Sequence, residues 1–194
     1  MKDPRYGELA KLLVHHSAQV KRGDKVLVEA FDIPTDFTTT LIRAIAEAGG
    51  IPLAQTYHDA VRRALQEVGS EAQLELMAEV DRHRMENVQC YVGIRGSWNI
   101  AEFSDVPREK MDLFERLYMH PVHMEQRVKK TRWVVLRWPL PSMAQSAGMS
   151  TEAKLMFASS FVARVIAASR KVLSPNTPTV PSTLVPSVAC SPAT

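Results

Sequence analysis

The sequence predicts an α/β fold in which a mostly parallel sheet of four to five strands lies between helical layers. Short runs of aliphatic and β-branched residues alternate with longer amphipathic stretches along the chain. The connections between these runs are too long for hairpins, and crossovers of that length join parallel strands in right-handed βαβ units. A chain of 194 residues is long enough for one well-buried core.

The first elements are a helix, a strand and a second helix. Residues 5–20 are predicted to be helical because their apolar side chains recur at helical spacing. His16 falls on that apolar face, so we expect it to be a core or boundary residue. Residues 25–31 are apolar enough to form a mostly buried strand. The helix that follows ends at Gly49, since glycine is common just after helices.

The later elements continue the alternation of strand and helix. Three further runs rich in β-forming residues are predicted strands, over residues 51–57, 87–94 and 132–138. A charged helical stretch over residues 59–85 is interrupted at Gly69 and restarted at Ser70, where the spacing to Gln73 is that of a capping box. A helix over residues 107–124 separates the last two strands.

The chain changes character near residue 154. All 21 acidic residues lie at or before Glu152. Residues 174–194 are rich in Pro, Ser and Thr and carry no charge, so we expect a disordered C-terminal tail. The sequence is therefore divided into an α/β domain over residues 1–153, a weakly capped helix over residues 154–173 and that tail.

Charge and hydropathy argue against two classes of partner. The net charge is only +3, and the first 154 residues are balanced, whereas a nucleic-acid-binding domain carries a face of uncompensated basic residues. No apolar stretch is long enough to span a bilayer without charges, and the N-terminus lacks a signal core. Two cysteines cannot form a disulfide framework. We expect no nucleic-acid partner, no membrane association and a cytoplasmic location.

The chain lacks a recognisable set of catalytic or metal-binding residues. His120 and His123 could meet one ion on a helix, but Pro121 lies between them and Glu125 is the only nearby carboxylate. Cys90 stands in the middle of a predicted strand, where a small buried apolar residue is the expected role. We therefore predict no catalytic residue and no metal ligand.

A turn with two glycines follows the third strand and is the best candidate for a binding feature. Ligands of parallel sheets bind outside the carboxyl ends of the strands. Exposed backbone amides and polar side chains there would suit an anionic or peptide-like group, although a turn that merely ends a strand is the commoner case. The candidate substrate-binding residues at this end are Arg95, Ser97, Asn99, Ser142 and Gln145.

Three segments carry a family likeness. Tyr-Val-Gly-Ile-Arg-Gly-Ser-Trp-Asn stands at residues 91–99, and Thr-Arg-Trp-Val-Val-Leu-Arg-Trp-Pro-Leu-Pro-Ser-Met begins a longer segment at residues 131–153. Val-Lys-Arg-Gly-Asp-Lys-Val-Leu-Val stands at residues 20–28. Over roughly residues 5–153 the chain resembles the N-terminal half of the thermophilic metallo-aminopeptidase family, typified by aminopeptidases T and S.

The resemblance implies a two-domain peptidase that removes N-terminal residues from peptides and is a homodimer when complete. The family uses a pair of divalent ions (zinc, cobalt or magnesium) held by glutamates, histidines and an aspartate of the C-terminal half. The likeness ends at Ala153, so we expect this chain to bind no metal and to be inactive alone. Our hypothesis is a truncation or a frameshift, with residues 154–194 read out of frame and the helix over 154–173 non-native.

A stand-alone α/β module is the alternative. In that case the turn Gly93–Asn99 would bind a ligand or serve dimerisation, and the chain would be no peptidase. Saturable binding of a small anion or peptide, abolished by Arg95→Ala, would support this alternative. Calorimetry with metals and with short peptides separates the two hypotheses.

Overall fold

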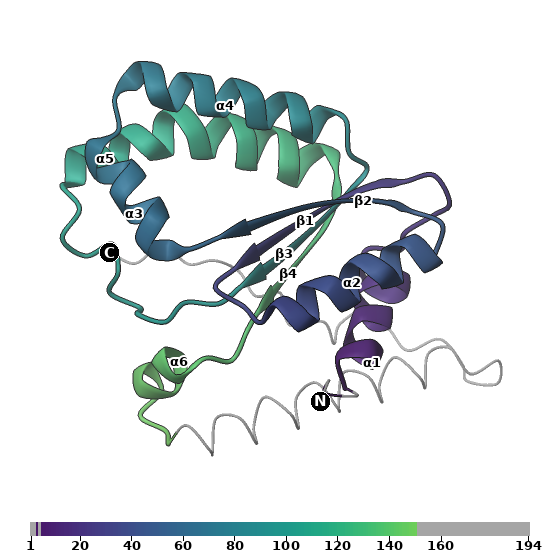
Figure 1. The fold of residues 1–194 in the computed structure, drawn as a ribbon. Helices are drawn as coiled ribbons and strands as arrows, with labels where there is room; N and C mark the ends of the chain where they lie inside the picture. The colour runs from purple at the N-terminus through teal and green to yellow at the C-terminus, as the bar shows by residue number, and fades with distance from the viewer. Residues whose placement is uncertain (1–2, 4, 151–194) are drawn as a thin grey trace, which may run out of the picture.

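A computed structural model describes residue 3 and residues 5–150 of the chain (Figure 1). Its centre is a four-stranded parallel sheet with the strand order β2-β1-β3-β4. The strands are β1 (Lys25–Phe31), β2 (Ile51–Tyr57), β3 (Cys90–Arg95) and β4 (Arg132–Arg137). The predicted α/β fold with a parallel sheet is confirmed for this part of the chain. The predictions for residues 154–173 and 174–194 lie outside the described residues.

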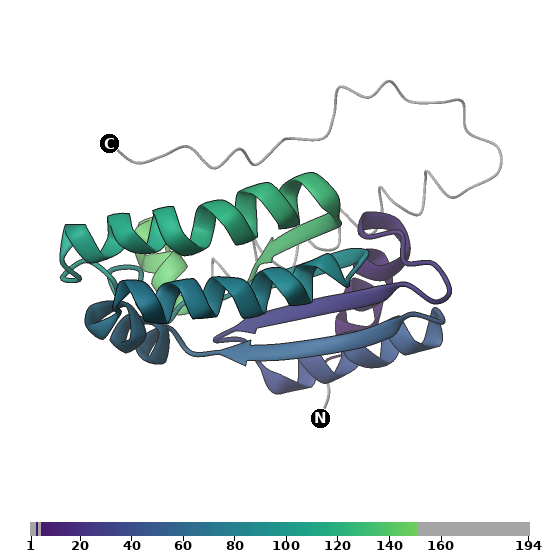
Figure 2. The same cartoon turned by 90° about the horizontal axis from the view of Figure 1, so that it is seen from above.

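Helices cover both faces of the sheet (Figures 1 and 2). One face carries α1 (Arg5–Lys11), η1 (Leu12–Ser17) and α2 (Thr35–Glu47), and the other carries α4 (Glu71–Glu86) and η2 (Glu115–Val128). The remaining helices α3 (Asp59–Val68), α5 (Arg108–Phe114) and α6 (Pro141–Ser146) lie toward the carboxyl ends of the strands. The chain runs outward from β1 to β2 and then back past β1 to β3. Because parallel crossovers are right-handed, the helices before and after this reversal pack on opposite faces of the sheet.

The larger apolar core lies between the sheet and α1, η1 and α2. Val26 and Val28 of β1 are fully buried against Leu41 and Ile45 of α2. Cys90 is also fully buried there, and burial raises the pKa of its thiol to about 11. The expected packing role of Cys90 is thus the observed one.

The first helix differs from the prediction. It is α-helical only to Lys11 and continues as the π-helix η1, in which the amide of Ala18 donates to the carbonyl of Leu13 at 2.8 Å. A π-helix has i→i+5 hydrogen bonds, so its buried face drifts from the α-helical spacing. The expectation of a core position for His16 is wrong, because its side chain is exposed while Val14 is buried.

The helix before β4 is also partly a π-helix and extends beyond Met124 to Val128. Pro121 lies inside it, although proline disrupts a regular α-helix by clashing with the carbonyl of residue i−4. The two histidines on it do not converge. His120 lies 3.7 Å from Glu125 Oε1, whereas Nδ1 of His123 contacts Arg127.

Two predicted helix ends have the expected chemistry. Gly49 follows α2 with φ of 81°, a left-handed conformation that glycine adopts without strain. Ser70 is the N-cap of α4, and its hydroxyl accepts from the Gln73 amide at 3.2 Å. Only half of the capping box forms, because the Gln73 side chain donates to the carbonyl of Leu65 instead.

Candidate functional site

The sheet face beneath α4 and η2 carries polar residues in rows that cross the strands. The strand register aligns Tyr57, Phe31, Arg95 and Arg137 at the carboxyl ends of β2, β1, β3 and β4. We call these four residues the carboxyl-edge row. The Phe31 and Tyr57 rings stack with centroids 4.7 Å apart, and the Arg95 guanidinium carbon lies 5.8 Å from the Phe31 centroid.

A buried ionic network lies one row further in, around Glu29. This carboxylate is only 3% exposed and accepts from the Tyr91 hydroxyl at 2.6 Å and from Arg127 Nη2 at 3.1 Å. The Arg127 guanidinium carbon also lies 3.9 Å from the centroid of the Tyr91 ring. A Cβ on Gly93 would lie 2.8 Å from the Tyr91 hydroxyl oxygen, so glycine leaves the space that this hydroxyl needs to reach Glu29.

His123 of η2 links this network to the carboxyl-edge row. Its Nδ1 lies 3.2 Å from Arg127 Nη1 and must be the acceptor, because a guanidinium only donates. Burial, with the charges of Arg127 and Arg95 beside it, lowers the pKa of His123 to about 4. His123 is therefore neutral in the folded protein at pH 7.

The neutral His123 predicts a loss of stability on acidification. Histidine in the unfolded chain protonates near pH 6.5. Between about pH 6.5 and 4, the unfolded state therefore binds a proton that the folded state does not bind. The contribution is intact above pH 6.5 and is lost as the pH falls to 4. We expect a loss of about 2 kcal/mol, since each pKa unit corresponds to about 1.4 kcal/mol and solvent screens part of it.

Urea denaturation at pH 7 and pH 4.5 tests this prediction against His123→Asn, which keeps an acceptor near Arg127 without the titrating ring. The variant should lose less free energy of unfolding between the two pH values than the parent chain. Equal losses would show that His123 does not cause the pH dependence.

The glycine turn after β3 is held by packing and by its own hydrogen bonds. A Cβ on Gly96 would lie 2.8 Å from the carbonyl oxygen of Asp32, so glycine permits the close approach of two backbones. The Ser97 hydroxyl donates to the carbonyl of Asn99 at 2.9 Å, and the Asn99 amide donates to Glu102 at 3.1 Å. The hydroxyl of the buried Ser142 donates to the carbonyl of Ser97.

The five candidate residues at this end are thus only partly brought together. Ser97, Asn99 and Ser142 form one hydrogen-bonded cluster. Gln145 is exposed on α6, and Arg95 belongs to the carboxyl-edge row under η2. Of the five, Arg95 and Gln145 have side chains that no hydrogen bond within the described residues occupies.

Sequence reasoning missed a carboxylate–histidine pair at the same end of the sheet. Asp32 follows β1 with φ of 46°, and its carboxylate accepts from the Asp59 amide at 2.8 Å and lies 2.9 Å from His58 Nδ1. A mostly buried carboxylate that orients an exposed imidazole is an arrangement that general bases use. The positions of Asp32 and His58 in the sequence could have indicated this pair, because each residue directly follows a strand and the two strands are neighbours.

The described residues do not fit a metal centre. Within residues 3 and 5–150, no three His, Cys, Asp or Glu side chains are grouped so that they could hold an ion. A hydrolytic metal ion needs three or four convergent ligands and an open position. None of the described helices is long and apolar enough to cross a membrane.

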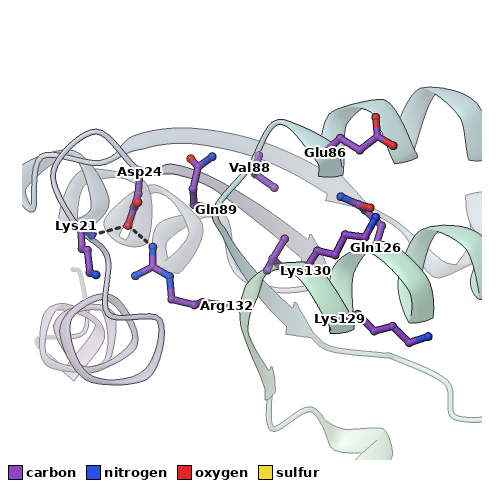
Figure 3. Close-up of a pocket in the computed structure, with 10 residues that line it drawn as sticks. Lys21, Asp24, Glu86, Val88, Gln89, Gln126, Lys129, Lys130 and Arg132 are labelled. Carbon is purple, nitrogen blue, oxygen red and sulfur yellow. Dashed lines mark hydrogen bonds and ion pairs between the residues drawn. The ribbon is translucent and has the colours of Figure 1, made fainter.

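A shallow pocket of about 690 Å³ opens at the opposite end of the sheet, where the strands begin (Figure 3). Its lining includes Asp24 and Arg132, which form an ion pair at 2.5 Å that ties the start of β1 to the start of β4. Lys21, Lys129 and Lys130 also line it. Lys129 Nζ is bound to Glu125 at 2.7 Å. We expected a ligand at the other end of the sheet, and no pattern in the sequence predicted this pocket.

Comparison with known proteins places the fold and the family. Wild-type AmpT from Thermus thermophilus has a similar structure, with a TM-score of 0.61 and 17% identity over 84% of this chain. The chain spans 42% of that protein's length. No curated protein matches the sequence. The family model of the thermophilic metalloproteases (M29) matches residues 2–170, which is most of the chain. The chain therefore belongs to the thermophilic metalloprotease (M29) family.

Proposed function

We propose that the described domain is the N-terminal part of a metal-dependent aminopeptidase, which hydrolyses N-terminal residues from peptides. The observation that carries this proposal is the family match over residues 2–170. The chain spans 42% of the AmpT chain, which supports a second half that supplies the catalytic groups. The match continues past residue 153, so it favours a domain boundary later than the one we expected.

The metal chemistry belongs to that second half in this proposal. A pair of zinc, cobalt or magnesium ions would activate water and polarise the scissile carbonyl. The described residues do not fit such a centre, so in this proposal they do not hold the ions. The chain alone is expected to be inactive.

The proposal includes a homodimer of the complete protein and a cytoplasmic location. Apolar side chains exposed on neighbouring helices support a surface that another chain or domain covers. On α3 and α4 they are Val61, Leu65, Val68, Leu76 and Val80. The free thiol of Cys90 is compatible with a reducing compartment.

The peptidase proposal is tested with the chain alone and with a completed protein. The purified chain should release no leucine from leucine p-nitroanilide with zinc, cobalt or magnesium, and calorimetry should detect no tight binding of these ions. Sequencing of the downstream DNA should reveal glutamates, histidines and an aspartate in another reading frame. A completed protein, in which the present chain is joined in frame to that downstream sequence (the rejoined protein), should then release leucine in a chelator-sensitive reaction.

Two outcomes would contradict the proposal. Chelator-sensitive release of leucine by the chain alone would show that its own residues build the metal centre. A rejoined, folded and metal-loaded protein that cleaves no peptide would show that the family's activity does not extend to this member.

A further inference from the structure

Two arginines lie side by side at the end of the carboxyl-edge row. Arg95 and Arg137 are register partners in β3 and β4, and neighbouring parallel strands are about 4.8 Å apart. Register partners project to the same face, which here is the face beneath η2. Two positive side chains that occupy adjacent positions on one face repel each other and destabilise a sheet.

Neither arginine has a carboxylate partner within residues 3 and 5–150, although other arginines around this face do. Arg62 binds Asp59 at 2.8 Å and Arg127 binds Glu29 at 3.1 Å. Nε of Arg95 is buried and, like Nε of Arg127, has no hydrogen-bond acceptor among the described residues, but Arg95 also lacks the carboxylate that Arg127 has. A buried donor without an acceptor is costly, so this position favours a partner that the described residues do not supply.

The surroundings add positive charge and an apolar wall. Arg127 and His123 lie on η2 above this face, and the charge of Arg95 contributes to the lowered pKa of His123. The Phe31 ring flanks Arg95 on the other side. The site also borders the carboxyl ends of β1 and β3, where the strand order reverses and open α/β sheets bind ligands.

We propose that Arg95 and Arg137 together bind the carboxylate of a peptide. Guanidinium groups donate in a planar fork that matches the two oxygens of a carboxylate, and the bound anion would offset the repulsion between the two arginines. That the anion is a peptide rests on the proposed peptidase function. That the two arginines bind a carboxylate rests only on their position and charge, and not on the proposed function.

The test measures binding of leucyl-glycyl-glycine and of its C-terminal amide to the full chain at low salt. Calorimetry should detect binding of the free acid to the parent chain, and Arg137→Gln should weaken that binding at least tenfold. The parent chain should bind the amide no more tightly than the Arg137→Gln variant binds the free acid. Arg43→Gln is the matched control, because Arg43 is an exposed arginine on α2, which covers the other face of the sheet. Its affinity should equal that of the parent chain.

Thermal unfolding gives a second readout that does not depend on the peptide. Arg137→Gln should raise Tm in the absence of anions, because it removes the repulsion, and added free-acid peptide should raise Tm of the parent chain but not of the variant. An unchanged Tm together with equal binding of acid and amide overturns the proposal. The metallopeptidase assignment would survive that result, since it is tested by the rejoined protein.

A carboxylate of the same chain is the competing source of the anion. Glu152 is the acidic residue nearest to the end of the described residues, and it lies outside them. If Glu152 occupied the arginines, Glu152→Gln would lower Tm and strengthen peptide binding, which would overturn a peptide ligand. An unchanged Tm and affinity in Glu152→Gln, with binding that depends on Arg137, supports the proposal.

Discussion

Glu29→Ala is expected to destabilise the domain by about 3–5 kcal/mol, because it leaves a buried guanidinium without its counter-charge. Arg127 is 6% exposed and Glu29 is 3% exposed, so water cannot replace the lost carboxylate without opening the contact between η2 and the sheet. The same change removes the acceptor of the Tyr91 hydroxyl. Urea denaturation at pH 7 would measure the free energy of unfolding.

Two further variants separate charge from packing in this network. Glu29→Gln keeps an acceptor for Tyr91 but loses the charge, so it should fall between the parent chain and Glu29→Ala. The double variant with Leu at positions 29 and 127 should recover much of the loss, since replacing both members of a buried ion pair with apolar residues is often nearly neutral. A change below about 1 kcal/mol in Glu29→Ala would contradict a tightly buried pair.

Phe37→Ala is expected to cost about 3–5 kcal/mol, because it removes a fully buried aromatic ring. Phe37 of α2 lies 5.4 Å from the Tyr6 ring of α1 and 4.7 Å from the Trp138 ring after β4, measured between centroids. Tyr6 and Trp138 also meet at 5.6 Å. The three rings join segments from the start, the middle and the end of the described chain.

Thermal and urea unfolding would measure the loss in Phe37→Ala. Phe37→Leu should cost clearly less, because leucine fills more of the cavity. Trp98→Ala is the control for loss of an aromatic ring without burial, since Trp98 is 65% exposed, and we expect a change within about 0.5 kcal/mol. Equal effects of Phe37→Ala and Trp98→Ala would refute the role of the three-ring cluster.

Two strands, the buried β1 and the more exposed edge strand β2, were predictable to the residue because their sequences are locally sufficient. Residues 25–31 and 51–57 are continuous runs bounded by turn residues, and the structure has β1 and β2 over the same residues. The alternation of strand and helix then implied parallel pairing, since a long crossover returns the chain in the same direction. Boundaries were less accurate at β3, which begins at Cys90 instead of residue 87.

The π-helices and the site could not be predicted in the same way. The sequence of residues 5–20 has apolar spacing compatible with an α-helix, and the shift to i→i+5 bonding appears only once the backbone has packed. Arg95 was recognised as a candidate from its place after a strand. Its neighbour Arg137 was not, because that pairing depends on the register between β3 and β4.

By itself, the sequence determined the fold class, the order of the elements and the family likeness, since these follow from local runs of residues and from long matching segments. Only the tertiary structure decided which charges are buried and which face one another. Glu29 and Arg127 are 98 positions apart in the chain, and Asp32 meets His58 across two strands. Such pairs form when the sheet brings residues that are distant in the sequence into one low-dielectric interior. No local sequence pattern predicts which distant residues will meet.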